Sequence, residues 1–340
     1  MADLPDSPDV FLSESEVLDL VMRFLVGHGL SREQAAPVAS SLAKAQKDGC
    51  RSHGLQRLPG VLDTIAHPRF DKRAEPELKD VTDAVAQVDA RFGFSLPAVE
   101  RGLPSLVAKA KALGISMLAI NNGFHFTALW PVVEEIAGHG LAALSMNPSH
   151  GWVAPFGGGK GILGTNPMAF AWPRKNQLPY VFDFATSAAA RADIALYKQQ
   201  GKPLPEGWGL DADGRPSTDP AAVLAGAMLP FGGHKGSALA TMIELMSSAM
   251  IGDRSSRQSQ AFDAGAKAAP CHGELIVAFN PALLAGGSVT DDSEALLDEI
   301  ARQGARLPGS RRYRERQASE KQGVRVPGLL YSRILALMPD

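Results

Sequence analysis

The apolar positions in the N-terminal part of the chain repeat every three or four residues, the spacing of amphipathic helices. One such pattern follows Ser13 and a second follows Ser31. Each serine has a Glu or Gln three positions later, the arrangement of a capping box at a helix start. A third apolar stripe follows Gly54. The pattern therefore predicts that the chain opens with a helical unit.

Short apolar runs bounded by turn residues dominate the middle of the chain and predict β-strands. We expect strands at residues 81–90, 115–120, 141–146, 168–172, 180–184 and 274–279, and helices at residues 96–113, 130–137, 236–250 and 293–302. Residues 202–221 are rich in Pro, Gly and Asp, which predicts an excursion or loop. Because the strands do not alternate regularly with helices, the predicted class is α/β of the mixed, α+β kind.

Composition excludes several classes of protein. The chain has 34 Lys and Arg against 36 Asp and Glu residues, so it lacks the basic excess typical of a general nucleic-acid binder. No apolar run reaches the roughly 18 residues of a membrane span. The acidic N-terminal residues do not resemble a signal peptide. Two cysteines in 340 residues cannot form a disulfide framework, which favours a cytoplasmic protein.

A glycine-rich run matches a dinucleotide-binding motif but has the wrong surroundings. Gly159, Gly161 and Gly164 fit G-x-G-x-x-G, a pattern that binds a pyrophosphate only where a helix begins directly after it. Pro167 and a β pattern follow here instead. We interpret the run as a tight loop that carries Thr165 toward a ligand, not as a Rossmann motif.

A second glycine-rich segment surrounds His234 and Lys235, just before the helix expected at residues 236–250. Glycines, a cation and a helix N-terminus together suit an anion, although the spacing is not that of a phosphate-binding P-loop. The same residues suit an ordinary helix start with a solvated lysine. Both interpretations stay open at this point.

Ser52, His53 and Arg57 lie close together between two predicted helices. Histidine is the side chain best suited to proton transfer near neutral pH, and arginine can hold a carboxylate through two hydrogen bonds. Ser52 would then orient His53. The alternative is a loop histidine that only caps a helix.

Two further candidates stand at the ends of predicted strands, where ligands often bind. His125 follows the strand at 115–120, and Asp183 lies near the end of the strand at 180–184. Each has a structural alternative, a core histidine and a helix cap respectively. The other histidines have no partner spacing, and we treat them as structural. No H-E-x-x-H or C-x-x-C motif is present, so we expect no metal site.

Taken together, these residues resemble the malate/L-lactate/ureidoglycolate dehydrogenase family, which is unrelated to the Rossmann dehydrogenases. The resemblance covers nearly all of residues 10–335. It rests on six segments in order: Asp48-Gly49 with Ser52-His53-Gly54 and Arg57; His125-Phe126; Gly164-Thr165-Asn166-Pro167; Asp183-Phe184-Ala185-Thr186-Ser187; Leu229-Pro230-Phe231-Gly232-Gly233-His234-Lys235-Gly236; and Arg306-Leu307-Pro308-Gly309.

Within the family, the chain is most similar to the Δ1-piperideine-2-carboxylate/Δ1-pyrroline-2-carboxylate reductases. The segment His125-Phe126-Thr127-Ala128-Leu129-Trp130-Pro131 carries this likeness. The segment at 188–193 is less glycine-rich than the family pattern. Residues 252–270 also depart from it, and we expect a variable loop there, at a dimer surface.

The resemblance implies a largely antiparallel, non-Rossmann NAD(P)-binding sheet domain joined to a helical domain, usually in a homodimer. We expect the helical domain at residues 1–78, completed by C-terminal helices at 290–340. The NADP-binding domain would span 79–289, with an excursion at about 188–230.

The resemblance also implies roles for individual residues. Ser52, His53 and Asp193 would form a catalytic relay with His53 as proton donor, while Arg57 and Thr165 would bind the substrate. Cofactor contacts would come from His125, Phe126, Thr127, Ala128, Leu129, Asp183, Phe184, Ala185, Arg191, Ala192, His234, Lys235, Arg306, Leu307, Pro308, Gly309, Ser310, Arg311 and Arg312.

The expected reaction is NADPH-dependent reduction of these cyclic imino acids to L-pipecolate or L-proline, with hydride passing to the imine carbon. NADPH is expected because Arg306, Arg311 and Arg312 suit a 2′-phosphate. The same residues would also serve an NAD(P)-dependent 2-hydroxy acid dehydrogenase acting on a C=O bond. A Ser-His-Asp hydrolase is a third possibility, but the chain lacks a G-x-S-x-G elbow.

Overall fold

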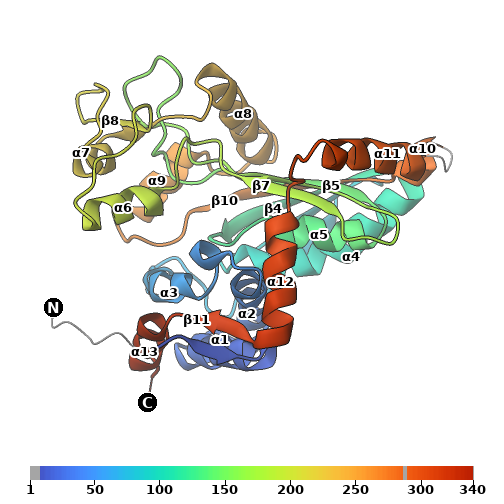
Figure 1. Ribbon diagram of the computed structural model, residues 1–340, viewed down its shortest axis with the longest axis horizontal. Coiled ribbons are helices and arrows are strands. Elements are labelled where there is room, and N and C mark those ends of the chain that lie inside the picture. The colour runs from blue at the N-terminus through green and yellow to red at the C-terminus, as the bar shows by residue number, and fades with distance from the viewer. Residues whose placement is uncertain (1–7, 286–288, 340) are drawn as a thin grey trace.

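A seven-stranded sheet forms the centre of the protein (Figure 1). The structure, a computed structural model, describes residues 8–285 and 289–339; most of the acidic N-terminus discussed above lies outside them. The strand order is β2-β3-β4-β10-β5-β6-β7, and only the β3–β4 pair is parallel. This confirms the largely antiparallel, non-Rossmann sheet. The strands are β2 (Glu77–Asp80), β3 (Val85–Asp89), β4 (Ile115–Phe124), β10 (Cys271–Phe279), β5 (Ala142–Met146), β6 (Met168–Trp172) and β7 (Tyr180–Phe184).

The helices α4 (Ser95–Leu113) and α5 (Trp130–Gly138) pack against the sheet through their apolar stripes. Leu106 of α4 and Ile136 of α5 are fully buried with Ile120 of the sheet. Gly114 ends α4 in the left-handed conformation, which glycine adopts without steric cost. Both predicted helices are confirmed to within one residue at each end.

The helical unit contains α1 (Glu14–Gly27), α2 (Arg32–Lys47) and α3 (Leu58–Ile65), joined by α13 (Gly328–Ala336). Two short strands, β1 (Val10–Leu12) and β11 (Val324–Val326), pair beside them. The capping box at Ser13 is complete, whereas at Ser31 only the serine half forms. The Gln34 side chain instead binds the backbone of Ala74 and Phe94.

The C-terminal segment is shared between the two units. Helices α10 (Pro281–Ala285) and α11 (Val289–Arg302) lie beside the sheet, where Glu294 pairs with Arg174 at 2.6 Å. Helix α12 (Ser310–Gln322) then crosses to the helical unit. Arg316 of α12 binds Asp48 through two hydrogen bonds of 2.9 and 2.6 Å and Glu134 of α5 at 2.7 Å. Thus α12 and α13, but not α11, return to the helical unit.

An excursion from the sheet packs around Val153, Ile194 and Met228. It contains α6 (Arg191–Gln199), β8 (Gly209–Leu210), α7 (Pro220–Ala225), β9 (Ala227–Met228), α8 (His234–Glu244) and the π-helix η3 (Leu245–Ala249). The expectation of a loop at 252–270 is wrong in part, because α9 (Ser256–Asp263) forms there with a capping box at Ser255. Among the described helices, none combines the length and apolarity that a membrane crossing requires.

Candidate active site

A cavity of about 1100 Å³ lies where the helical unit, the sheet and the excursion meet. It is larger than the roughly 300–1,000 Å³ typical of pockets for small ligands. Residues from all six resembling segments except the one around His234 line it. The predicted site residues in its wall are Ser52, His53, Arg57, His125, Phe126, Thr127, Ala128, Thr165, Asp183, Phe184, Ala185, Arg191, Ala192, Asp193, Arg306, Pro308, Gly309, Arg311 and Arg312.

Five predicted site residues are not part of this wall: Leu129, His234, Lys235, Leu307 and Ser310. His234 and Lys235 begin α8 and are exposed. The two interpretations left open for them were an anion site and an ordinary helix start. Because neither residue lines the cavity, the structure gives no support to an anion site there. Leu129 contributes its backbone N–H to the neighbouring structure instead of its side chain to the cavity.

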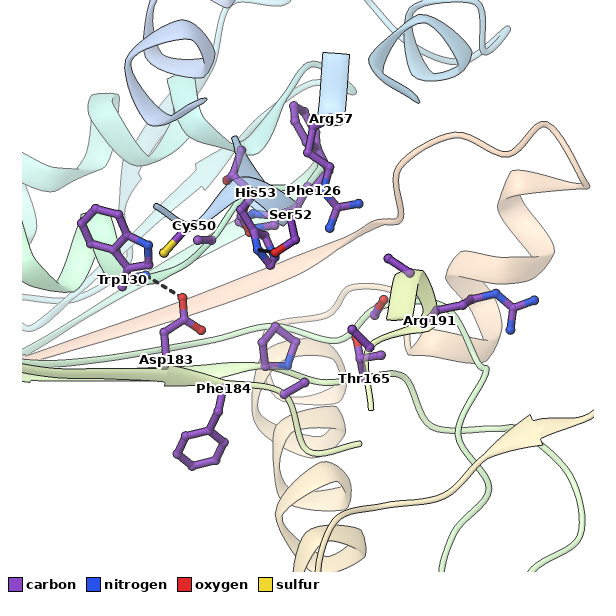
Figure 2. Close-up of a pocket in the computed structure, with 18 of the residues that line it drawn as sticks. Cys50, Ser52, His53, Arg57, Phe126, Trp130, Thr165, Asp183, Phe184 and Arg191 are labelled. Carbon is purple, nitrogen blue, oxygen red and sulfur yellow. Dashed lines mark hydrogen bonds between the residues drawn. The ribbon is translucent and has the colours of Figure 1, made fainter. Parts of the chain in front are cut away.

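Ser52 and His53 form a tight helical turn, η1 (Arg51–His53), followed by a second, η2 (Leu55–Arg57). Gly54 joins them because a Cβ there would lie 2.5 Å from Oε1 of Gln46. That oxygen accepts a hydrogen bond from the N–H of Leu55. The Ser52 hydroxyl lies 3.2 Å from Nδ1 of His53, so these neighbouring side chains do meet. Both face the cavity in Figure 2.

The electrostatic surroundings of His53 favour a neutral ring. Burial, followed by the positive charges of Arg57 and His125, lowers the pKa of His53 to about 3. A histidine with such a pKa carries no proton to give at neutral pH until a ligand changes its surroundings. A proton-donor role for His53 therefore requires a negatively charged ligand.

Arg57 is the cation best placed to accept such a ligand. Its guanidinium extends into the cavity, toward the side where Thr165 and Arg191 lie (Figure 2). Its Nε is buried without a hydrogen-bond partner among the described residues, and burial lowers its pKa. Because buried polar groups are normally paired, the geometry suits an anion that binds Arg57.

Asp193 lies in the first turn of α6 and is exposed on the cavity wall. The His53 ring forms a hydrogen bond with the Ser52 hydroxyl, and among the described residues Asp193 has none to His53. Only the Ser52–His53 half of the predicted relay is therefore present as a contact, and the Asp193 role stays a prediction.

His125 belongs to a buried polar cluster that the sequence did not reveal. Its Nδ1 lies 2.7 Å from the Ser95 hydroxyl and 3.3 Å from Oε2 of Glu274, and its Nε2 lies 3.0 Å from the carbonyl of Thr127. Burial lowers the pKa of His125, but the Glu274 carboxylate outweighs burial and raises it. His125 is thus a buried member of the cavity wall whose positive form Glu274 stabilises.

Asp183 acts as a cap and also lines the cavity, so its role as a cofactor contact stays a prediction. Its Oδ2 accepts hydrogen bonds from the backbone N–H groups of Leu129 and Trp130 at 2.9 and 3.0 Å, the second drawn in Figure 2. These groups begin α5, where the helix dipole favours an anion. Burial raises the pKa of Asp183, and its two hydrogen bonds hold the backbone of Leu129 and Trp130 against the sheet.

The basic residues near the C-terminus divide into two kinds. Arg312 is buried, stacks 4.7 Å from the ring of Trp130 and donates a hydrogen bond to the carbonyl of Val181. Arg306 and Arg311 line the cavity and are exposed, with no ion pair to the residues that the structure describes. These two arginines, rather than Arg312, are available to an anionic ligand.

Within residues 8–285 and 289–339, no group of three or more His, Cys, Asp or Glu side chains is arranged to hold a metal ion. Besides Glu274 and Ser95, the structure adds Asn147 and His272 to the site, since both are buried and line the cavity. An isolated glutamate within the apolar strand at 274–279 was the one signal of this cluster in the sequence.

Known proteins of similar sequence cover nearly the whole chain. The Δ1-pyrroline-2-carboxylate reductase of Pseudomonas fluorescens is 51% identical over 332 residues, which are 97% of this chain and 99% of that protein. A Δ1-pyrroline-2-carboxylate/Δ1-piperideine-2-carboxylate reductase of Pseudomonas aeruginosa is 47% identical over 95% of this chain and 98% of its own.

Solved structures agree with these sequences. The Δ1-piperideine-2-carboxylate reductase of Pseudomonas syringae superposes with a TM-score of 0.93 at 41% identity, covering 96% of this chain and 99% of that one. The family profile described as malate/L-lactate dehydrogenase matches residues 12–335. The chain therefore belongs to the malate/L-lactate dehydrogenase family of oxidoreductases.

Proposed function

We propose that this protein reduces the cyclic imino acids Δ1-pyrroline-2-carboxylate and Δ1-piperideine-2-carboxylate to L-proline and L-pipecolate, with NADPH as the reductant. The observation that carries the proposal is that His53, whose pKa is lowered, and Arg57, whose buried Nε has no hydrogen-bond partner among the described residues, line one cavity. The relatives that share about half of their residues with this chain are named as reductases of these imino acids, which supports the choice of substrate.

Arg57 would bind the substrate carboxylate, and Thr165 would bind the same molecule from the opposite wall. Fixing the substrate in this way removes much of the entropic cost of aligning it. The carboxylate would offset the positive charge of Arg57, which is one cause of the low pKa of His53. His53 would then hold a proton and pass it to the lone pair that the nitrogen gains as the protonated imine is reduced.

When bound, the nicotinamide would supply a hydride to the imine carbon. One C–H bond would form, the C=N double bond would become a C–N single bond, and the electron pair left on nitrogen would take the proton from His53 as a new N–H bond. Ser52 would orient the imidazole through Nδ1, and Asp193 would complete the relay. The free cations Arg306 and Arg311 fit the phosphates of a dinucleotide, and we propose that they select NADPH by its 2′-phosphate.

Reduction of a C=O bond in a 2-oxo acid is the second candidate, favoured by the family that the chain belongs to. His53 and Arg57 would act in the same way on either substrate. Assays of the purified protein separate imine reduction from 2-oxo acid reduction. The substrates are both cyclic imino acids, pyruvate and other 2-oxo acids, each tested with NADPH and with NADH. We further propose that the enzyme is a cytoplasmic homodimer.

Replacing Arg57 with lysine is expected to raise KM for the imino acid about tenfold. Lysine keeps the charge but cannot form the paired hydrogen bonds of a guanidinium with a carboxylate, and each bond to a charged group contributes about 1.5–3 kcal/mol. Steady-state kinetics measure KM for the imino acid, and a nicotinamide fluorescence titration measures the affinity for NADPH. An unchanged KM, or an equal loss of NADPH affinity, would remove Arg57 from the substrate site.

Binding of a carboxylate is expected to make the protein take up protons at mildly acidic pH. Burial and the positive charges of Arg57 and His125 lower the pKa of His53 to about 3 in the free protein. A carboxylate on Arg57 offsets one of these charges, so the pKa rises and His53 binds protons.

This uptake is measured by calorimetry in buffers of different ionisation heat. The ligand is pyrrole-2-carboxylate, which the enzyme cannot reduce as an imine. The His53→Gln variant is expected to show little of it, because glutamine does not titrate. Proton release, or equal uptake by both proteins, would contradict the assignment to His53.

A further inference from the structure

Asn147 lies in the cavity wall directly after β5, and no role follows for it from the motifs above. It is 3% exposed. Its neighbour Met146 pairs with Met168 in the sheet, and its own N–H donates to the carbonyl of Pro167 at 3.4 Å. Asn147 therefore lies beside the loop that carries Thr165 into the cavity.

Two contacts fix the orientation of the Asn147 side chain. Its Nδ2 donates to the carbonyl of Pro148 at 2.6 Å and faces Nε2 of His272 at 3.4 Å. Turning the amide over would bring its oxygen against the carbonyl oxygen of Pro148, where neither atom can donate. The nitrogen of the amide is therefore committed to the protein interior.

His272 is the acceptor that this arrangement needs. Its Nδ1 lies 3.0 Å from the carbonyl of Gly273, so Nδ1 carries the proton and Nε2 is left as an acceptor. Burial and the positive charge of His125 hold the pKa of His272 well below its ordinary value, which keeps the ring neutral. The chain of contacts from Gly273 through His272 to Asn147 is thus consistent at every atom.

The remaining polar atom of Asn147 has no partner. Its Oδ1 is buried and receives no hydrogen bond from any residue that the structure describes. Buried side-chain oxygens are normally satisfied, and this one belongs to a residue of the cavity wall. A ligand with an N–H donor would satisfy it.

We propose that Oδ1 of Asn147 accepts a hydrogen bond from the N–H of the protonated imine and thereby selects imino acids over 2-oxo acids. This inference rests on the proposed function. A 2-oxo acid presents a carbonyl oxygen at the same place, and two acceptors facing each other repel. Asn147 is then a specificity-determining residue, and His272 is the positioning residue that orients it.

The test compares two planar ring carboxylates that differ in one group. Pyrrole-2-carboxylate carries an N–H donor next to the carboxylate, whereas furan-2-carboxylate carries an oxygen there. With oxidised cofactor present, the wild-type enzyme is expected to bind the pyrrole at least about tenfold more tightly, the value of one good hydrogen bond. Asn147→Leu and Asn147→Ala are each expected to abolish this ratio while leaving cofactor affinity unchanged.

Asn121→Leu is the matched control. Asn121 is also a buried asparagine, but both ends of its amide are bonded, to Gln87 and to the carbonyl of Ile251. It is not part of the cavity wall, so its loss is expected to affect stability and leave the pyrrole-to-furan ratio intact.

Imino-acid turnover without discrimination between the two rings in the wild type would overturn the inference and leave the proposed function standing. A pyrrole-to-furan ratio that survives in the Asn147 variants would also overturn the inference. If these variants lose NADPH and NADH affinity equally, the donor to Oδ1 would be the nicotinamide carboxamide instead of the imine. Failure to reduce any imino acid would overturn both proposals.

Discussion

Replacing His53 with alanine is expected to lower kcat by at least about a hundredfold, the low end for loss of a general acid. NADPH affinity is expected to stay near the wild-type value, because Arg306 and Arg311, the cations proposed to bind the phosphates, stay in place in this variant. Steady-state assays with an imino acid and a fluorescence titration with NADPH measure the two quantities.

His139→Ala is the control for this variant. His139 is exposed and follows the C-terminal end of α5, away from the cavity wall, so its loss is expected to leave kcat unchanged. A His53→Ala protein with full turnover would show that the proton comes from another group.

Removing both free cations of the C-terminal loop, as Arg306→Ala with Arg311→Ala, is expected to weaken NADPH binding about ten- to a hundredfold or more. A 2′-phosphate carries nearly two negative charges, and each charge-assisted hydrogen bond to it contributes about 1.5–3 kcal/mol. NADH has a neutral hydroxyl group at this position, so its affinity is expected to change little. The dissociation constants of NADPH and NADH, measured before and after the double substitution, give the cofactor preference that tests this prediction.

Two single variants serve as controls for the charge effect. Arg314→Ala removes an exposed cation of α12 that does not line the cavity and is expected to leave the ratio unchanged. Arg312→Ala removes the stack on Trp130 and is expected to weaken both cofactors alike. A wild-type preference for NADH, or a ratio unmoved by the double substitution, would assign the cofactor as NAD.

Local patterns were sufficient to predict most helices and strands but not their arrangement. The apolar period of residues 96–113 defines α4, because from Gly102 onward its buried residues recur every three or four positions up to Ala110. The position of β10 between β4 and β5 could not be predicted, since it depends on pairing between segments more than 100 residues apart. The short strands β1 and β11 were missed because three residues each carry no period.

The site was predicted where its chemistry is local in sequence. Ser52, His53 and Arg57 lie within six positions of one another, and the structure brings all three to the cavity. Glu274, Asn147 and His272 were missed, because a buried carboxylate or amide gains meaning only from partners on other strands. The likeness to a known family supplied the role of Asp193, and among the described residues Asp193 has no hydrogen bond to His53. His234, predicted as a cofactor contact, is not among the residues that line the cavity.

The ion pair between Asp48 and Arg316 joins residues 268 positions apart, and β1 pairs with β11 near the two ends of the chain. During translation the N-terminal helices emerge first, yet the strand and helices that complete their core emerge last. We therefore expect the helical unit to close only after β11, α12 and α13 have left the ribosome, which is later than every strand of the central sheet. Folding commonly proceeds from the N-terminus in larger proteins. Here we expect the apolar faces of α1 and α2 to stay open to chaperones until their C-terminal partners emerge.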